Sequence, residues 1–137
     1  MDGGWEIQQV VLRVARCSDR ADVPALVDNF TDDGVLEAGG RTVAGRDALF
    51  EFFGGGRAPA PPDNERTKHV VTNTLLEAGT EPGSVITTSY FQVLRSWGVA
   101  NWGRYVDGMV REGDRWRIAH RSVFVDGNIP RPEAPPA

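Results

Sequence analysis

The residues of this chain that are best suited to acid–base chemistry are its two histidines, His69 and His120. His69 lies in a β-rich segment, and side-chain alternation along a strand would place Thr67, His69, Val71, Asn73 and Leu75 on one face. Imidazole groups titrate near neutral pH, so one that projects into an apolar pocket is an effective general base. Its other ring nitrogen needs a partner that fixes the tautomer, and a carboxylate there would also stabilise the imidazolium ion.

Other reaction chemistries lack their characteristic motifs in this sequence. There is no CxxC or HExxH motif, and no carboxylate cluster suited to a metal site. The glycine-rich nucleotide-binding motifs GxGxxG, GxxxxGKS and GxxxxGKT are also absent. The sequence therefore predicts neither a metal nor a cofactor.

Length and composition predict one globular domain of 137 residues. The net charge of -4 and the scattered arginines argue against a nucleic-acid partner, and the apolar runs are too short for a membrane span. No basic segment followed by an apolar one marks a secretory signal at the N-terminus. The single cysteine, Cys17, cannot form an internal disulfide, which favours a reducing cytoplasm.

The first half of the chain carries helical patterns. Apolar residues recur at the three- and four-residue spacing of an amphipathic helix between Trp5 and Ser18. Asp22 has the position of the N-cap of a second helix, which extends toward Phe30 and ends in the turn-forming residues 31–34. A short strand over 35–38, a Gly-Gly turn and a third helix over 46–53, ended by glycines 54–56, complete this half.

The second half begins with a long loop over residues 54–64, of a kind that either covers a pocket or is mobile. We expect strands over 66–77, 84–96, 101–111 and 116–125, joined as an antiparallel meander by short turns. Helices followed by a meander predict an α+β fold, in which a cone-shaped curved sheet wraps around the N-terminal helices and has a hollow end. The domain would span residues 1–128, followed by a disordered proline-rich tail over 129–137.

Three sequence strings resemble the SnoaL-like branch of the nuclear-transport-factor-two-like superfamily. The first spans Ala15 to Val35, with its aspartate-bearing turn, second helix and first strand. The second is the histidine-bearing Lys68–Asn73, and the third combines Gly103–Tyr105 with the closing hairpin Gly113–Ala119. Together they cover nearly the whole chain apart from the loop and the tail. The resemblance implies the cone-shaped fold of that superfamily.

The resemblance also implies a catalytic pair. In this superfamily, enzymes of the hexachlorocyclohexane dehydrochlorinase and scytalone dehydratase type use an aspartate and a histidine together as a general base. In the dehydrochlorinase the aspartate lies in the turn after the first helix and the histidine on the first long strand, and Asp19 and His69 match these positions. The plainer alternative is that Asp19 is a solvated turn residue paired with Arg16 or Arg20, and His69 a core histidine.

Five further residues are candidates for substrate contacts: Arg121, Asn73, Tyr105, Leu36 and Phe30. By the resemblance, Arg121 enters the pocket and stabilises a leaving group or an oxyanion, on a face that it shares with Arg117, Ala119 and Val123. Each candidate also has a structural alternative: an exposed arginine, an asparagine bonded to the backbone, and ordinary packing for the others. His120 lies on the opposite face from Arg121, and we expect it at the surface or in an interface.

Two classes of function fit these features. The first is a cofactor-independent lyase, isomerase or cyclase that acts on a small, largely apolar organic substrate, as in polyketide tailoring. The second is a binding or assembly module with the same fold and no chemistry; an accessory subunit of a ring-hydroxylating dioxygenase ranks last. Exposed sheet aromatics favour a homodimer or homotrimer. The sequence names neither the substrate nor the reaction.

Overall fold

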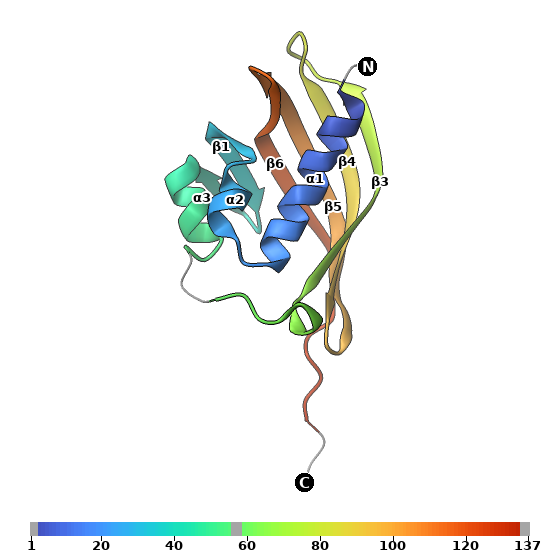
Figure 1. Ribbon diagram of the computed structural model, residues 1–137. Coiled ribbons are helices and arrows are strands. Elements are labelled where there is room, and N and C mark those ends of the chain that lie inside the picture. The colour runs from blue at the N-terminus through green and yellow to red at the C-terminus, as the bar shows by residue number, and fades with distance from the viewer. Residues whose placement is uncertain (1–2, 56–58, 135–137) are drawn as a thin grey trace.

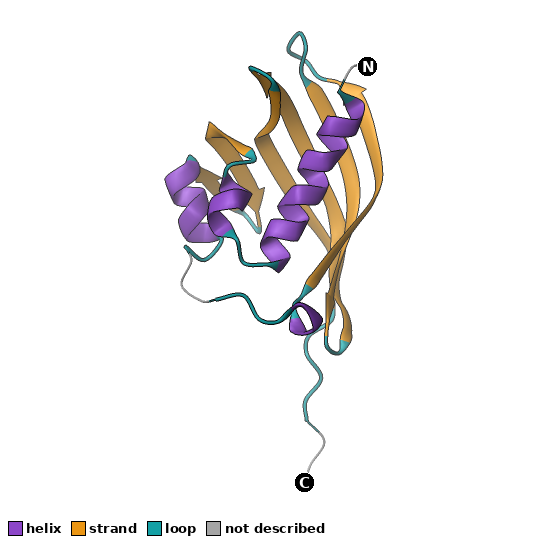
Figure 2. Ribbon diagram, viewed as in Figure 1, coloured by secondary structure: helices purple, strands orange, loops and turns teal. Residues whose placement is uncertain are grey.

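The computed structural model describes residues 3–55 and 59–134 of the chain. Within these residues, helices α1 (Gly4–Asp19), α2 (Val23–Val27) and α3 (Arg46–Phe52) lie on the concave side of a curved sheet (Figures 1 and 2). The strands are β1 (Phe30–Ala38), β2 (Arg41–Ala44), β3 (Lys68–Ala78), β4 (Val85–Arg95), β5 (Gly98–Glu112) and β6 (Arg115–Asn128), and a 3-10 helix, η1, spans Asp63–Glu65. The α+β class and the curved sheet around the N-terminal helices that the sequence predicts are confirmed, and the sheet is not closed.

The order of strands in the sheet is β2-β1-β6-β5-β4-β3. The four long strands β3 to β6 form the predicted antiparallel meander, joined by short turns. β1 extends the sheet on its other side, where it pairs with β6 in parallel and with β2 in an antiparallel hairpin. β3 is therefore an edge strand, and its outer edge faces α1 rather than another strand.

The first strand region differs from the prediction in two ways. β1 begins at Phe30 instead of residue 35, because the residues expected to form a turn are part of a strand whose register shifts between Phe30 and Val35. β2 has no counterpart in the prediction. The Gly39–Gly40 turn, in which both residues have positive φ, suits a tight hairpin and brings β2 back against β1.

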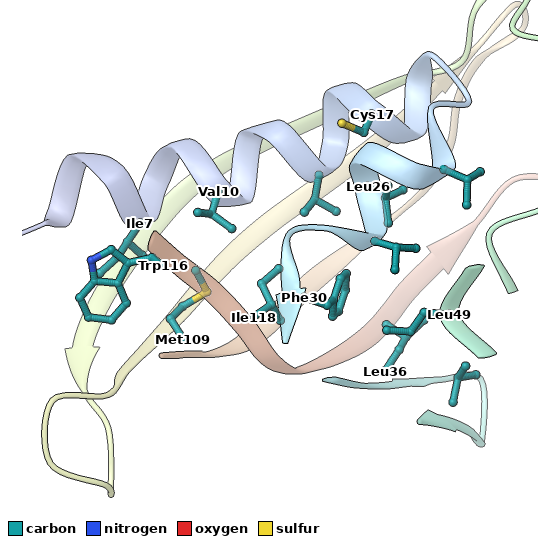
Figure 3. Close-up of a cluster of buried hydrophobic side chains, with 14 of the residues drawn as sticks. Ile7, Val10, Cys17, Leu26, Phe30, Leu36, Leu49, Met109, Trp116 and Ile118 are labelled. Carbon is teal, nitrogen blue, oxygen red and sulfur yellow. The ribbon is translucent and has the colours of Figure 1, made fainter. Parts of the chain in front are cut away.

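α1 has the amphipathic character that its sequence predicts. The apolar residues at helical spacing, Ile7, Val10, Val11, Val14 and Cys17, are all buried. The amino-terminal half of this helix packs on the sheet through a dense cluster with Met109, Trp116 and Ile118 (Figure 3). The core therefore fills the space between α1 and the sheet at this end.

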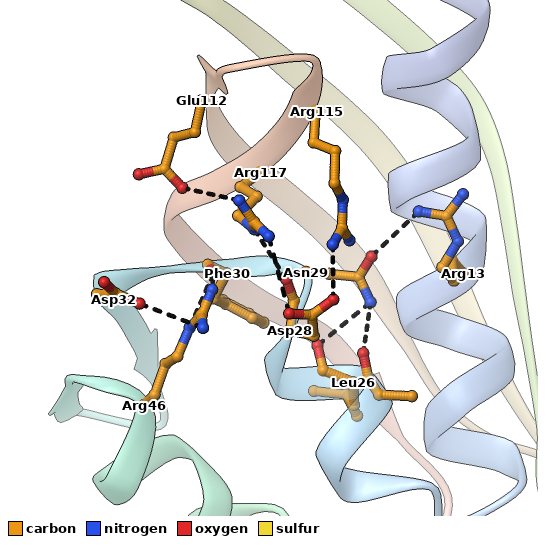
Figure 4. A network of polar contacts seen from close by, with 11 residues as sticks. Arg13, Leu26, Asp28, Asn29, Phe30, Asp32, Arg46, Glu112, Arg115 and Arg117 are labelled. Carbon is orange, nitrogen blue, oxygen red and sulfur yellow. Dashed lines mark hydrogen bonds and ion pairs between the residues drawn. The ribbon is translucent and has the colours of Figure 1, made fainter.

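A polar cluster holds α2 and β1 to the closing hairpin (Figure 4). The carboxylate of Asp28 accepts a hydrogen bond of 2.9 Å from Arg115 and lies 3.8 Å from Arg117. Asn29, which is buried, donates to the carbonyl groups of Ala25 and Leu26. These contacts fix the short helix and the start of β1 against β6.

The long loop and the proline-rich tail lie only partly within the described residues. Gly56, one of the glycines expected to end α3, lies outside the described residues, as do residues 57–58 of the long loop. Residues 129–134 have neither helix nor strand, and the N–H of Ile129 donates to Ala100; residues 135–137 are outside the described part, so the disordered tail stays a prediction. None of the helices within 3–55 and 59–134 is long and apolar enough to cross a membrane.

Candidate active site

Asp19 and His69, which are 50 residues apart in sequence, meet where the carboxyl end of α1 passes over the start of β3. The Oδ1 atom of Asp19 lies 2.6 Å from Nδ1 of the imidazole. The backbone N–H of His69 also donates to this carboxylate, at 3.0 Å to Oδ1 and 3.2 Å to Oδ2. The side chain of Asp19 is 8% exposed and that of His69 22%. The carboxylate is thus contacted by two nitrogen atoms of one residue.

Local structure explains why Asp19 is available for this contact. It is the last residue of α1, and the next helix is capped by Asp22, whose side chain accepts from the N–H of Ala25 at 3.3 Å. A carboxylate is unfavourable at the carboxyl end of a helix, because the helix dipole is negative there. The edge of β3 supplies the compensating donors, since the N–H of an edge strand needs a partner outside the sheet.

A pocket of about 260 Å³ lies between the carboxyl-terminal half of α1 and the sheet. Its walls are mainly apolar and include Val14, Leu36, Phe53, Phe91 and Val93. The polar side chains that line it are few: Ser18, His69, Arg95, Asn101, Tyr105 and Arg121. A mostly apolar pocket with a few convergent polar groups is typical of a small-molecule site.

Cross-strand pairing determines where these polar groups lie along the pocket. His69 pairs with Val93 and Val93 with Asn101, so these three lie side by side across β3, β4 and β5. Further along the same face, Tyr105 stacks on Phe91 with the ring centroids 4.4 Å apart. Burial raises the pKa of the Tyr105 hydroxyl above its ordinary value, so the phenol stays protonated at neutral pH.

Arg121 and Asp107 form a buried ion pair at the inner end of the pocket. The Nε and Nη2 atoms of Arg121 donate to the two oxygens of Asp107 at 2.7 and 2.9 Å. The guanidinium also lies over the ring of Tyr105, 4.1 Å from its centroid. Burial lowers the pKa of Arg121, but the charge and hydrogen bonds of Asp107 outweigh it, so the net pKa is raised and the arginine is charged.

Comparison with known protein families identifies the fold. The SnoaL-like domain family matches residues 4–122 of the chain. The chain belongs to the SnoaL-like family. Comparison with curated protein sequences found no match.

Solved structures share the fold of this chain. A Nostoc punctiforme protein of unknown function with a cystatin-like fold is 19% identical over 92% of both chains, with a TM-score of 0.78. A Catenulispora acidiphila protein, solved in complex with S-DNPA, is 26% identical over 88% of this chain and 91% of its own, with a TM-score of 0.73. A Novosphingobium aromaticivorans protein, named as a candidate scytalone dehydratase, is 16% identical over 94% and 87%, with a TM-score of 0.75.

Two of the predicted substrate contacts are placed elsewhere in this SnoaL-like domain. Asn73 is exposed and outside the pocket, because the β3–β4 register shifts between Thr72 and Leu75 and Asn73 takes a positive φ of 56°. Phe30 is fully buried in the core, where its ring lies 6.4 Å from that of Phe53, and it does not line the pocket. The expectation that Asn73 and Leu75 share the face of His69 is therefore wrong.

Leu36, Tyr105 and Arg121 do line the pocket. The expectation that Arg121 shares a face with Arg117 is wrong, because the pairing of β5 with β6 shifts between Gly108 and Met109. Ala119 is the extra residue at this shift, so the buried side of β6 changes from Trp116 and Ile118 to Arg121. His120 is turned away, and its Nε2 lies 3.6 Å from Glu37.

Asp107 is a fully buried acidic residue that the sequence patterns do not single out. The available signal is its spacing from Tyr105, because residues two apart on a strand share a face. Its pairing with Arg121 depends on the bulge at Ala119, which the sequence does not mark. Among the described residues, no group of three or more histidine, cysteine or acidic side chains is placed to hold a metal ion.

Proposed function

We propose that this SnoaL-like domain is a cofactor-independent enzyme in which His69 acts as a general base and Asp19 orients it. The substrate is a small, largely apolar organic molecule bound in the pocket. Proton abstraction from carbon or oxygen would then lead to elimination, isomerisation or ring closure. The observation that carries the proposal is the 2.6 Å contact between Asp19 Oδ1 and His69 Nδ1 at the wall of an apolar pocket.

The geometry of the pair suits this role. When Nδ1 carries the proton and donates it to Asp19, the lone pair of the imidazole is on Nε2, the nitrogen that is not used by Asp19. A proton taken by Nε2 creates an imidazolium ion, which the carboxylate stabilises. The backbone N–H of His69 fixes Asp19 at the same time, so the orientation of the pair requires little reorganisation during the reaction.

Two donors deeper in the pocket suit a developing negative charge on the substrate. Tyr105 carries its hydroxyl proton at neutral pH, since burial raises further a pKa that is already well above neutral. Arg121 also lines the pocket, and it uses Nε and Nη2 for Asp107, so Nη1 is not part of that ion pair. Hydrogen bonds from such pre-positioned donors stabilise an enolate or alkoxide in the transition state.

The comparisons support an enzyme or a ligand-binding domain of this kind. One structural neighbour is named as a candidate scytalone dehydratase, and another was solved in complex with S-DNPA. The alternative of binding without chemistry would be favoured if Asp19 and His69 were out of hydrogen-bond reach. The short contact between them supports the catalytic proposal instead.

Deuterium uptake tests the proposed base without requiring the complete reaction. Bicyclic aromatic ketones and keto esters with an activated C–H bond would be incubated with the protein in D2O, and incorporation followed by mass spectrometry. We expect His69→Gln to slow enzyme-dependent exchange about 10²- to 10⁴-fold, the usual contribution of a general base. His120→Gln is the matched control, because His120 lies outside the pocket and pairs with Glu37. An unchanged exchange rate in His69→Gln would end the proposal.

The role of Asp19 has a test that needs no substrate. Nitrogen-15 NMR of the imidazole distinguishes the nitrogen that carries the proton from the one that does not. We expect neutral His69 in the wild type to carry its proton on Nδ1, and Asp19→Asn to redistribute the tautomers, since an amide presents a donor as well as an acceptor. Equal populations of the two tautomers in the wild type would contradict the assigned orientation.

Self-association through the outer face of the sheet is a separate proposal. Tyr90, Arg104 and Phe124 lie in one row across β4, β5 and β6, and the two aromatic residues are 57% and 42% exposed. A homodimer or homotrimer in the cytoplasm would cover this row. Light scattering of the wild type and of Tyr90→Glu tests it, and a monomeric wild type would overturn it.

A further inference from the structure

Arg95 is the cation of the pocket that lacks an acidic partner among the described residues. Two arginines line the pocket, Arg95 and Arg121. The charge of Arg121 is balanced by the buried Asp107, at 2.7 Å. Arg95 instead donates from Nη1 to the hydroxyl of Thr67 at 3.1 Å, which leaves its other terminal nitrogen and Nε for a ligand. Arg95 is therefore the arginine of the pocket lining whose positive charge is not balanced by an ion pair.

A second cation lies at the same end of the molecule. The guanidinium carbons of Arg95 and Arg131 are 5.9 and 5.7 Å from the ring centroid of Trp97. No ion pair of Arg131 is present in the described part of the chain. The indole Nε1 of Trp97 is buried there and has no acceptor in the described part of the chain. Within the described residues neither of these two arginines has an ion-pair partner, since the carboxylate of Asp63 pairs with Arg66 and Lys68 instead.

The strand geometry gives the position of Arg95 relative to the proposed base. Val93 is the cross-strand neighbour of His69, and Arg95 is two residues further along β4. Two residues along a strand correspond to about 7 Å. Arg95 is exposed while Val93 is buried, so Arg95 marks the mouth of the pocket and His69 lies further in.

We infer that the substrate of this site is an aromatic carboxylic acid. Its apolar body would lie against Phe91 and Tyr105, and its carboxylate would be bound by Arg95 at the mouth. This inference rests on the proposed function for the position of the reacting atom, but the recognition of the acid is independent of the chemistry. A guanidinium binds a carboxylate through parallel N–H donors, and at the mouth the carboxylate keeps part of its hydration.

Binding of two matched compounds tests the inference. The compounds are 2-naphthoate and 2-naphthamide, which share an apolar body and differ in charge, and their dissociation constants would be measured by calorimetry at low salt. We expect naphthoate to bind about tenfold more tightly, as for one charge-assisted hydrogen-bond pair at a partly exposed site. The preference should shrink as salt is added, because salt screens exposed charges.

Substitutions assign the preference to one side chain. Arg95→Gln should remove the preference for naphthoate and leave the affinity for naphthamide unchanged, whereas Arg95→Lys should retain part of the preference. Arg111→Gln is the matched control, since Arg111 is exposed at the end of β5, where it donates to the carbonyl group of Gly113. Equal binding of both compounds by the wild type, no binding of either, or a preference that survives Arg95→Gln would each overturn the inference.

The same measurement in His69→Gln separates this inference from the proposed function. A preference for naphthoate that persists in His69→Gln supports recognition by Arg95, whatever the outcome of the exchange experiment. A preference lost in His69→Gln but kept in Arg95→Gln would assign the anion to the histidine and overturn the inference. A failed catalytic role thus shows in deuterium exchange, and failed acid recognition in the binding constants.

Discussion

The space between α1 and the sheet is filled by side chains at one end and open at the other. At the closed end, Val85, Met109 and Ile118 form one row across β4, β5 and β6 and pack on the start of α1. At the open end, the corresponding row is Val93 and Asn101 beside His69, and a pocket of about 260 Å³ remains. α1 and the long strands contribute to both ends, so the difference lies in the side chains they present and in the register shifts that direct those side chains.

The space between α1 and the sheet thus contributes both to stability and to a binding site. Buried apolar rows at the closed end provide the packing that holds the helix on the sheet. At the open end, polar groups and empty volume replace part of that packing, as is common at functional sites. The pair Arg121 and Asp107 lies at the boundary, directly beside the row of Met109 and Ile118.

Removing the carboxylate at this boundary should have the largest effect on stability. Asp107→Ala leaves the guanidinium of Arg121 charged, buried and without its ion-pair partner, since the two side chains are 0% and 6% exposed. We expect the free energy of unfolding to fall by about 3–5 kcal/mol in urea denaturation, as for other broken buried pairs.

Two variants serve as controls for that measurement. Asp114→Ala changes an exposed aspartate in the β5–β6 turn and should alter the free energy of unfolding by less than about 0.5 kcal/mol. The double variant Asp107→Leu with Arg121→Met removes both charges and should recover most of the loss. A loss below about 1 kcal/mol in Asp107→Ala would mean that water from the pocket reaches Arg121 and that the boundary is not dry.

A matched pair of valines compares the two ends directly. Val85 and Val93 lie on the same face of β4 and are 4% and 5% exposed, but Val85 belongs to the packed cluster and Val93 lines the pocket. We expect Val85→Ala to cost roughly 2 kcal/mol in urea denaturation, because it leaves a cavity in a packed region. Val93→Ala should cost about 1 kcal/mol, since its methyl groups partly face empty space. Equal losses would show that the pocket end is as tightly packed as the core.

The closed end and the general fold follow well from the sequence. The apolar spacing in α1 predicts its buried stripe, and Asp22 caps α2 as expected. Short turns between β-rich segments predict the meander, because loop length largely determines how neighbouring strands pair. These signals are local: each lies within one element or one turn.

The open end depends on irregularities that local patterns do not contain. Asn73 leaves the face of His69 because the register of β3 shifts just before it, and Arg121 turns inward because Ala119 is an extra residue in β6. A one-residue shift moves every later side chain to the other face of a strand. The sequence does not indicate the buried ion pair of Asp107 for the same reason, since the register shift at Ala119 places Arg121 opposite it. The contact between Asp19 and His69 is predicted by the family resemblance and not by the spacing of residues within one element.

The smallest expected effect concerns the polar cluster that closes the packed end. The hydrogen bond from Arg115, together with its charge and those of Arg117 and Arg46, lowers the pKa of Asp28 below its ordinary value of 3.8, against a smaller opposing effect of burial. A lowered pKa in the folded state means that Asp28 contributes stability above pH 3.8, and that this contribution is lost as the pH falls through the lower value. About half of the side chain is exposed, so solvent screens the interaction and the contribution should stay below about 1 kcal/mol.

Urea denaturation of the wild type and Asp28→Asn at pH 7 and at pH 3 or below measures this contribution. We expect the wild type to be more stable at pH 7 and the difference to shrink in acid, because the carboxyl group is then increasingly protonated in both states. Asp114→Asn is the control, since Asp114 is exposed in the β5–β6 turn and its substitution should change the free energy of unfolding little at either pH. A difference that grew in acid would have the wrong sign for a lowered pKa, and the cluster would then hold the closed end by packing and backbone contacts instead of by charge.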